Sequence, residues 1–106
     1  MADRNRPAAA PPQRGSRYCF TPHARERLAK RYGIDLTPAL ADLVFQQVMA
    51  AAMPTEGVPV GRLLRPDGPT RAWWQVTLAG QSVVVVVELM PLPIIITAQP
   101  RNEVRP

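Results

Sequence analysis

Residues 71–89 read RAWWQVTLAGQSVVVVVEL and contain two neighbouring runs of residues that favour β-strands. The run from Ser82 to Leu89 holds five consecutive valines, which predict a central strand covered on both faces for most of its length. The residues 79–81 between the two runs predict a turn, so the pair forms a hairpin. In the first run the side chains alternate, which predicts one face with Ala72, Trp74, Val76 and Leu78 and another with Arg71, Trp73, Gln75 and Thr77.

Two further strands and two helices are predicted around this hairpin. A short strand is expected at 58–65, with Pro59 and Gly61 marking it as an edge strand, and residues 66–69 predict a turn. The last strand is expected at 94–98, after a proline-rich connection at 90–93. Thr-Pro pairs at 21–22 and 37–38 predict the starts of two helices, because threonine caps free amides and proline tolerates the first helical position.

The two helices are expected to end differently and to be buried to different extents. Gly33 is able to adopt the left-handed conformation that ends many helices, so the first helix should end at Tyr32. The second helix should continue to about Met53 and stop at Pro54. It is predicted to be largely buried, because apolar residues at helical spacing form a wide stripe: Leu40, Leu43, Val44, Val48 and Ala51, broadened by Phe45 and Met49.

The order helix, helix and four closely linked strands predicts an α+β fold. Both helices are expected on one face of a four-stranded antiparallel sheet. Residues 18–99 would form this single domain, and residues 100–106 a C-terminal tail. Residues 1–17 carry no hydrophobic period and hold four arginines against Asp3, so an extended basic Arg/Ala/Pro-rich arm is predicted there.

The composition favours a polyanionic partner and narrows the chemistry. Among 106 residues, 13 Lys and Arg stand against 8 Asp and Glu, giving a formal charge of +5, and only Lys30 of those cations is a lysine. The single cysteine, Cys19, excludes an internal disulfide and a cysteine-based zinc site. No metal or cofactor is expected. The apolar runs are too short to span a bilayer, so no membrane partner and a cytoplasmic protein are predicted.

The first predicted helix carries the most informative polar residues. At helical spacing His23, Arg27, Lys30 and Arg31 fall on one stripe, beside an apolar stripe. His23 is the only histidine, and its side chain is the one whose unperturbed pKa lies near neutrality. A histidine among cations suits binding, and also cutting, a phosphodiester backbone, for which His23 would supply the base or acid and Arg27 and Arg71 the cations on the phosphate. A structural role for His23, bonded to a neighbouring strand or loop, remains open.

The order of elements, together with the run His-Ala-Arg-Glu-Arg-Leu-Ala-Lys-Arg-Tyr-Gly-Ile at residues 23–34, resembles the RelE/ParE-like superfamily of small bacterial toxins. It looks closest to the BrnT-like and related branches whose first helix begins with His-Ala-x-x-Arg. The resemblance implies a curved four-stranded sheet packed on two helices. It also implies RNA binding, cleavage of messenger RNA without metal, and an antitoxin as the protein partner. The fold alone does not confer catalysis, because the superfamily includes inactive binding modules.

The sheet face away from the helices is the second place where a partner is expected. There Trp73 is predicted to be exposed beside Arg71 and Gln75, as a platform for nucleic-acid bases or a contact for a protein. Lys30, Arg31 and Arg62 are expected to join Trp73 and Gln75 in binding. The alternative function is a non-enzymatic assembly component, such as a bacteriophage virion structural protein, whose arm and tail contact neighbouring subunits.

Overall fold

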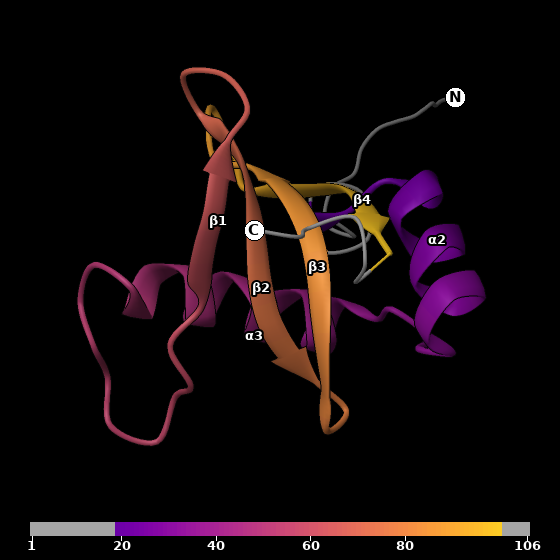
Figure 1. Cartoon of the computed structure of the whole chain (residues 1–106), viewed down its shortest axis with the longest axis horizontal. Helices are drawn as coiled ribbons and strands as arrows, with labels where there is room; N and C mark the ends of the chain where they lie inside the picture. Colours follow the sequence, from indigo (N-terminus) through magenta and orange to yellow (C-terminus); the bar gives the residue numbers. More distant parts are fainter. Residues whose placement is uncertain (1–18, 101–106) are drawn as a thin grey trace, which may run out of the picture.

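The computed structural model describes residues 19–100 and confirms the α+β fold (Figure 1). The predicted arm at 1–17, and all of the predicted tail except Pro100, lie outside the described residues. Two helices precede four strands, and the elements follow in the order α2 (Pro22–Tyr32), α3 (Pro38–Ala50), β1 (Arg62–Pro66), β2 (Arg71–Leu78), β3 (Gln81–Glu88) and β4 (Ile94–Gln99).

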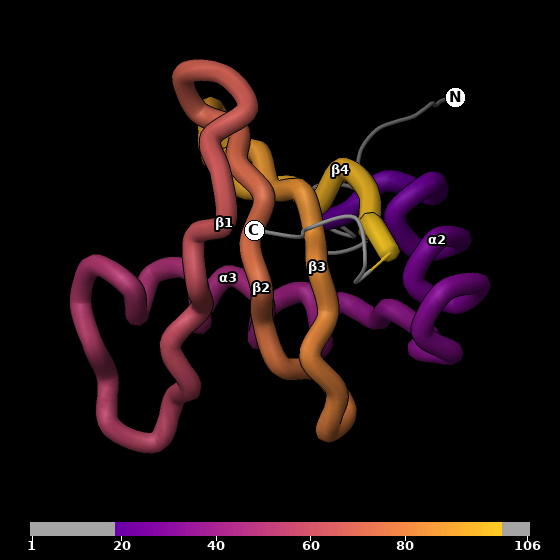
Figure 2. Tube along the Cα trace, in the orientation of Figure 1, coloured from indigo at the N-terminus to yellow at the C-terminus, as the bar shows by residue number. Residues whose placement is uncertain are grey.

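The four strands form one antiparallel sheet in the order β1-β2-β3-β4. Figure 2 shows the strong twist of this sheet: β1 to β3 run side by side, whereas β4 turns across them towards α2. One row of paired residues crosses the sheet and consists of Leu63 on β1, Trp74 on β2, Val85 on β3 and Ala98 on β4. The side chains of this row share one face. The neighbouring row, with Arg65, Trp73 and Val86, lies on the other face.

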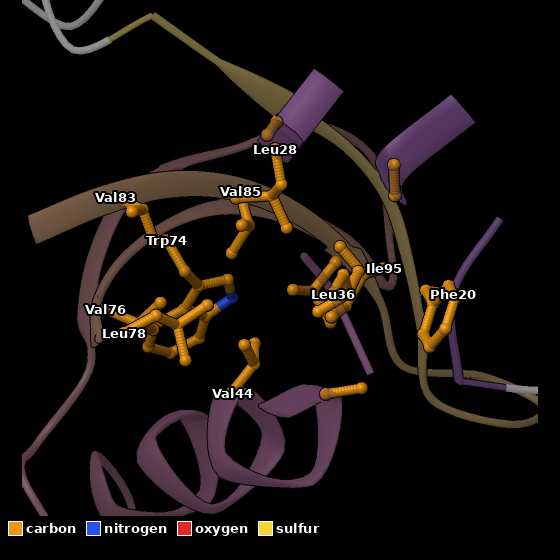
Figure 3. Packing of buried hydrophobic residues seen from close by; sticks show 14 of the residues in the cluster. Phe20, Leu28, Leu36, Val44, Trp74, Val76, Leu78, Val83, Val85 and Ile95 are labelled. Carbon is orange, nitrogen blue, oxygen red and sulfur yellow. The ribbon is translucent and has the colours of Figure 1, made fainter. Parts of the chain in front are cut away.

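Both helices pack on the same face of the sheet, as the sequence predicts. α3 crosses behind the strands in Figure 1, while α2 lies beside β4. The common core joins Ala24 and Leu28 of α2 to Val44 and Val48 of α3, and Figure 3 shows these helices meeting the sheet around Trp74. Other buried members of the core are Phe20, Ile34, Leu36, Ala41, Val76, Leu78, Val83, Val85, Val87, Ile95 and Ala98.

The helix starts and the first helix end are confirmed in atomic detail. The Thr21 hydroxyl accepts a hydrogen bond from the Ala24 amide at 2.9 Å, and the Thr37 hydroxyl accepts one from the Leu40 amide at 3.2 Å. Gly33 ends α2 with a φ of 69°, in the left-handed region that glycine tolerates. Thr21 also donates its hydroxyl to the Ile96 carbonyl at 2.8 Å, so this cap fixes α2 to β4.

The second helix is shorter and less buried than predicted. α3 ends at Ala50 rather than Met53, and the segment after it turns away from the helical path. Leu43 and Met49 are 42% and 56% exposed, and Ala51 is exposed, so the prediction of a largely buried helix is wrong. The reason is that α3 lies under the sheet along one side only. Its fully buried side chains are Ala41, Val44, Gln47 and Val48, with Ala50 at the end.

The edge strand β1 begins at Arg62, four residues later than the predicted start at Val58. The Gly61 amide donates to the backbone carbonyl of Gln47 at 2.8 Å, so α3 takes the hydrogen bond that a longer strand would give to β2. The Gln47 side chain then bonds both backbone groups of Thr77, accepting from its amide and donating to its carbonyl, each at 2.8 Å. Gln47 of α3 therefore supplies the hydrogen bonds at the edge of β2 that β1 does not reach.

Candidate nucleic-acid interface

The sheet face opposite the helices is called the helix-free face here. No helix of the described part of the chain lies on it, and Figure 1 looks onto it. The strand register gives its side chains: Arg62 and Arg65 on β1, Arg71, Trp73, Gln75 and Thr77 on β2, Ser82, Val84, Val86 and Glu88 on β3, and Ile94, Thr97 and Gln99 on β4. At the two register shifts, Leu64 and Ile96 pack against Trp73 on the same face. Polar and cationic residues therefore surround a few apolar ones.

Trp73 lies on this face, but the prediction that its indole is exposed is wrong. The residue is 8% exposed and packs with Val84 and Val86 in a small second core, against the partly buried Leu64 and Ile96. The Arg65 guanidinium lies over the ring, 4.1 Å from its centroid. The pairing of β1 with β2 has a register shift between Leu63 and Arg65. This shift brings the side chains of Leu64 and Arg65 onto Trp73. The face therefore has an apolar floor beneath a cation rather than a free aromatic platform.

The β1 border of the helix-free face carries two arginines. Arg62 pairs in register with Gln75, and Arg65 pairs with Trp73, so both lie on this face and both are exposed. Neither forms an ion pair with any residue between Cys19 and Pro100. Gln75, the partner of Arg62, donates its amide to the Ser82 hydroxyl at 2.5 Å, so the middle of the face holds neutral hydrogen-bonding groups. The β1 border thus keeps both its positive charges.

The opposite border is formed by α2, which hydrogen bonds fix against β4. The Tyr32 hydroxyl donates to the Gln99 carbonyl at 2.6 Å and accepts from the Val84 amide at 3.2 Å. Arg31 reaches the Gln99 side chain, which lies on the helix-free face, at 3.5 Å between Nη1 and Oε1. The predicted basic stripe therefore continues this face along its β4 side.

His23 and Arg27 lie together on that stripe. The Arg27 Nε donates to His23 Nε2 at 3.4 Å. His23 and Lys30 are exposed, and Arg27 is half-buried. His23 and Arg27 are adjacent, as the sequence predicts.

Arg71 is not part of this cluster. It lies on β2, so β3 and β4 separate it from α2, and its Nε donates to the Glu88 carboxylate at 2.9 Å. The Thr70 hydroxyl donates to the other oxygen of the same carboxylate. The hydrogen bonds from Thr70 and then Arg71 lower the pKa of Glu88 below its ordinary value. The structure thus brings together two of the three predicted catalytic residues, and it neutralises the third with an acid.

Acidic side chains are scarce on the helix-free face. Glu88 is the one acidic residue within the four strands, and Arg71 pairs with it. Asp35 lies on the far flank of α2, where it pairs with Arg25 at 3.3 Å, and Asp42 is exposed on α3 behind the sheet. Along residues 19–100 no three His, Cys, Asp or Glu side chains come close enough to hold a metal ion. No helix in the same range has the length and apolar character to cross a membrane.

Sequence reasoning missed Arg65 and the residues around Tyr32. Arg65 was not selected because an uninterrupted period of two does not reveal the register shift that places it on Trp73. Gln81 and Gln99 were not selected because glutamines at strand ends carry no motif, although both contact the end of α2. Comparisons with models of known protein families, with curated proteins and with solved structures give no match. The RelE/ParE-like resemblance therefore stays a prediction.

Proposed function

We propose that this domain binds single-stranded RNA across its helix-free face. The observation that carries the proposal is the distribution of charge: two groups of cations border the face, and the one acidic residue of the four strands, Glu88, is paired with Arg71. The first border holds Arg62 and Arg65 on β1. The second holds Arg27, Lys30 and Arg31 on α2. Cations without acidic partners attract phosphates, and arginine binds them with a planar set of donors.

The width of the face suits a flexible strand. Four strands at about 4.8 Å spacing place β1 and β4 about 15 Å apart, with α2 beyond β4. An RNA strand that crosses the sheet can contact both borders with its phosphates. Between them lie the polar side chains of Gln75, Ser82 and Gln99, above a buried apolar layer that contains Val84 and Val86. A duplex hides its bases, so a single strand uses more of this surface.

The test is the affinity of the full chain for a fluorescein-labelled single-stranded RNA, measured by anisotropy at several salt concentrations. We expect Arg62→Ala and Lys30→Ala each to weaken binding and to reduce the dependence of log K on log salt by about one phosphate contact. Arg25→Ala is the matched control, because Arg25 is an exposed arginine on the same helix that pairs with Asp35 away from the face. Equal losses in the three variants would contradict the proposed surface.

The absence of any RNA affinity would reject the proposal as a whole. The alternative function would then be favoured, namely an assembly component such as a virion structural protein. That alternative predicts that the arm and tail contact neighbouring subunits; a covering of Trp73 by another chain no longer distinguishes it, because Trp73 is already buried within this chain. Both outcomes concern binding and not cleavage. Binding is therefore measured in EDTA, which removes metal ions that contaminating nucleases need, and a gel checks that the RNA is intact.

Metal-independent cleavage is the second candidate function, favoured by the contact between His23 and Arg27 beside the face. In this reaction His23 removes the proton from a 2′-hydroxyl, whose oxygen bonds to the adjacent phosphorus and displaces the 5′-oxygen. Arg27 stabilises the charge that develops on the phosphate, and water protonates the 5′-oxygen as it leaves. Labelled RNA incubated with the chain in EDTA should then yield fragments, and His23→Ala should abolish them while binding persists. Intact RNA with the wild-type chain would reject cleavage and leave the binding proposal unchanged.

A further inference from the structure

A pocket of about 420 Å³ lies where the end of α2 meets the start of β3 and the end of β4. It is lined by Arg31, Tyr32, Gln81 and Pro100. Arg31 also contacts Gln99 of the helix-free face, so the pocket adjoins the proposed RNA surface. Its volume lies within the range of pockets that hold small ligands.

The polar groups of this pocket do not suit a phosphate. Arg31 is the single cation among the four lining residues, and Pro100 has no amide hydrogen to donate. The pocket also lies at the carboxyl end of α2, where exposed carbonyl groups carry partial negative charge. A phosphate is bound best by several donors at a helix start, so a ligand with both acceptors and donors fits better here.

Hydrogen bonding assigns the free groups of Gln81. The Tyr32 carbonyl oxygen can only accept a hydrogen bond, so the Gln81 atom that faces it at 2.9 Å is the side-chain nitrogen. The side-chain oxygen of Gln81 therefore points away from Tyr32 and is an acceptor. Arg31 supplies only donors, and its 3.5 Å contact with Gln99 is long enough to be replaced easily. The pocket thus presents a donor fork and an acceptor.

We propose that this pocket binds a guanine base of the RNA. Arginine recognises guanine by donating to its O6 and N7 atoms, and the Gln81 oxygen would accept from the N1 and N2 hydrogens. Adenine fits less well, because its N6 group is a donor that faces the donors of Arg31. One of the two hydrogens on the Gln81 amide nitrogen is used by the Tyr32 carbonyl, so the preference for guanine over adenine rests on Arg31 together with the Gln81 oxygen. This inference rests on the proposed function and adds a base preference to it.

The experiment compares four nine-nucleotide RNAs, each with eight uridines and a central G, A, C or U, in the anisotropy assay with the full chain. We expect the G-containing RNA to bind about tenfold more tightly than the others. In Gln81→Met, which removes the acceptor without changing charge, this ratio should fall to near one. Gln46→Met is the matched control, because Gln46 is exposed on α3 and contacts Asp42 there; it should retain the preference.

The possible failures of the two proposals are distinguishable. Equal affinities for the four RNAs with the wild-type chain would overturn the guanine pocket, while the general RNA surface would stand. Retention of the preference in Gln81→Met would also overturn it. Guanosine monophosphate is titrated separately, with nuclear magnetic resonance of the Gln81 side-chain amide as the readout. If the mononucleotide shifts this signal and no oligonucleotide binds, the pocket stands and the proposed function fails.

Discussion

Gln47 shows how one buried polar residue connects a helix to a sheet. Its side chain is 2% exposed, and it bonds both backbone groups of Thr77 at a point where β2 has β3 on one side but no β1 residue on the other. β1 pairs only with residues 72–75 of β2, so the outward-facing groups of Thr77 would otherwise lack partners. Buried backbone groups without partners are costly, which explains a glutamine on the buried side of α3.

Replacing Gln47 by methionine should therefore destabilise the fold by about 2–4 kcal/mol, because two backbone groups lose their partners. Urea unfolding followed by circular dichroism measures this free energy. The neighbouring variant Gln46→Met is the control, since Gln46 is exposed and its replacement should change stability by less than about 0.5 kcal/mol. Similar stability of the two variants would contradict the role of Gln47.

Glu88 gives the fold a dependence on acidic pH. Hydrogen bonds from Thr70 and Arg71 lower the pKa of its carboxyl in the folded state, so their stabilisation is fully present above the ordinary value of 4.5. It is lost as the pH falls below 4.5 and through the lower pKa of the folded state. The difference in melting temperature between the wild type and Glu88→Gln should therefore become smaller as the pH is lowered from about 6 to about 3. Calorimetry at several pH values measures this difference. A constant difference would contradict this pairing.

At the scale of elements, the contact between Gly61 and α3 sets where β1 begins. A Cβ atom at Gly61 would lie 2.9 Å from the Gln47 carbonyl oxygen and 3.0 Å from its carbon, both of which are backbone atoms. The amide of Gly61 also donates to this carbonyl. The close approach explains why a strand that the sequence predicts from Val58 starts only at Arg62.

Gly61→Ala should destabilise the fold by about 1–3 kcal/mol, because α3 or the segment before β1 must move to admit a methyl group. Urea unfolding gives the free energy, and amide spectra should show changes concentrated around Gln47 and Thr77. If the variant is as stable as the wild type, the close packing of these backbones is contradicted.

The elements could largely be predicted from local sequence, but several contacts between them could not. The caps of α2 and α3 depend on residues three positions apart, so Thr21 and Thr37 were sufficient. The bond between Gly61 and Gln47 joins two segments that the sequence pattern treats separately. Apolar spacing also overstated the buried width of α3, because it does not tell how much of a helix the sheet covers; Leu43 and Met49 are exposed.

The candidate site could be predicted where it depends on residues close in the sequence, but not where it depends on strand register. His23, Arg27 and Arg31 share a stripe through helical spacing, and the structure keeps them together beside the sheet. The pairing of Arg71 with Glu88 depends on strand register, and the burial of Trp73 depends on a register shift in β1. Alternation correctly gave the face on which Trp73 lies, but not the side chains that cover it.

At the scale of the whole molecule, charge and packing divide the domain into two sides. The helices and the large core lie on one side, with Asp42 exposed on α3 behind the sheet. On the other side a small apolar floor lies between the arginines of β1 and the basic stripe of α2. This division favours a ligand that lies across the strands and touches both borders, and it gives α3 no direct part in binding.

The most direct test of this division is a map of amide chemical shifts in the ¹⁵N-labelled chain, recorded while single-stranded RNA is added. We predict progressive shifts at Arg62 and Arg65 on β1 and at Arg27 and Arg31 on α2, in the same titration, with the exposed residues of α3 unchanged. Shifts confined to α3, or to one border alone, would contradict binding across the helix-free face.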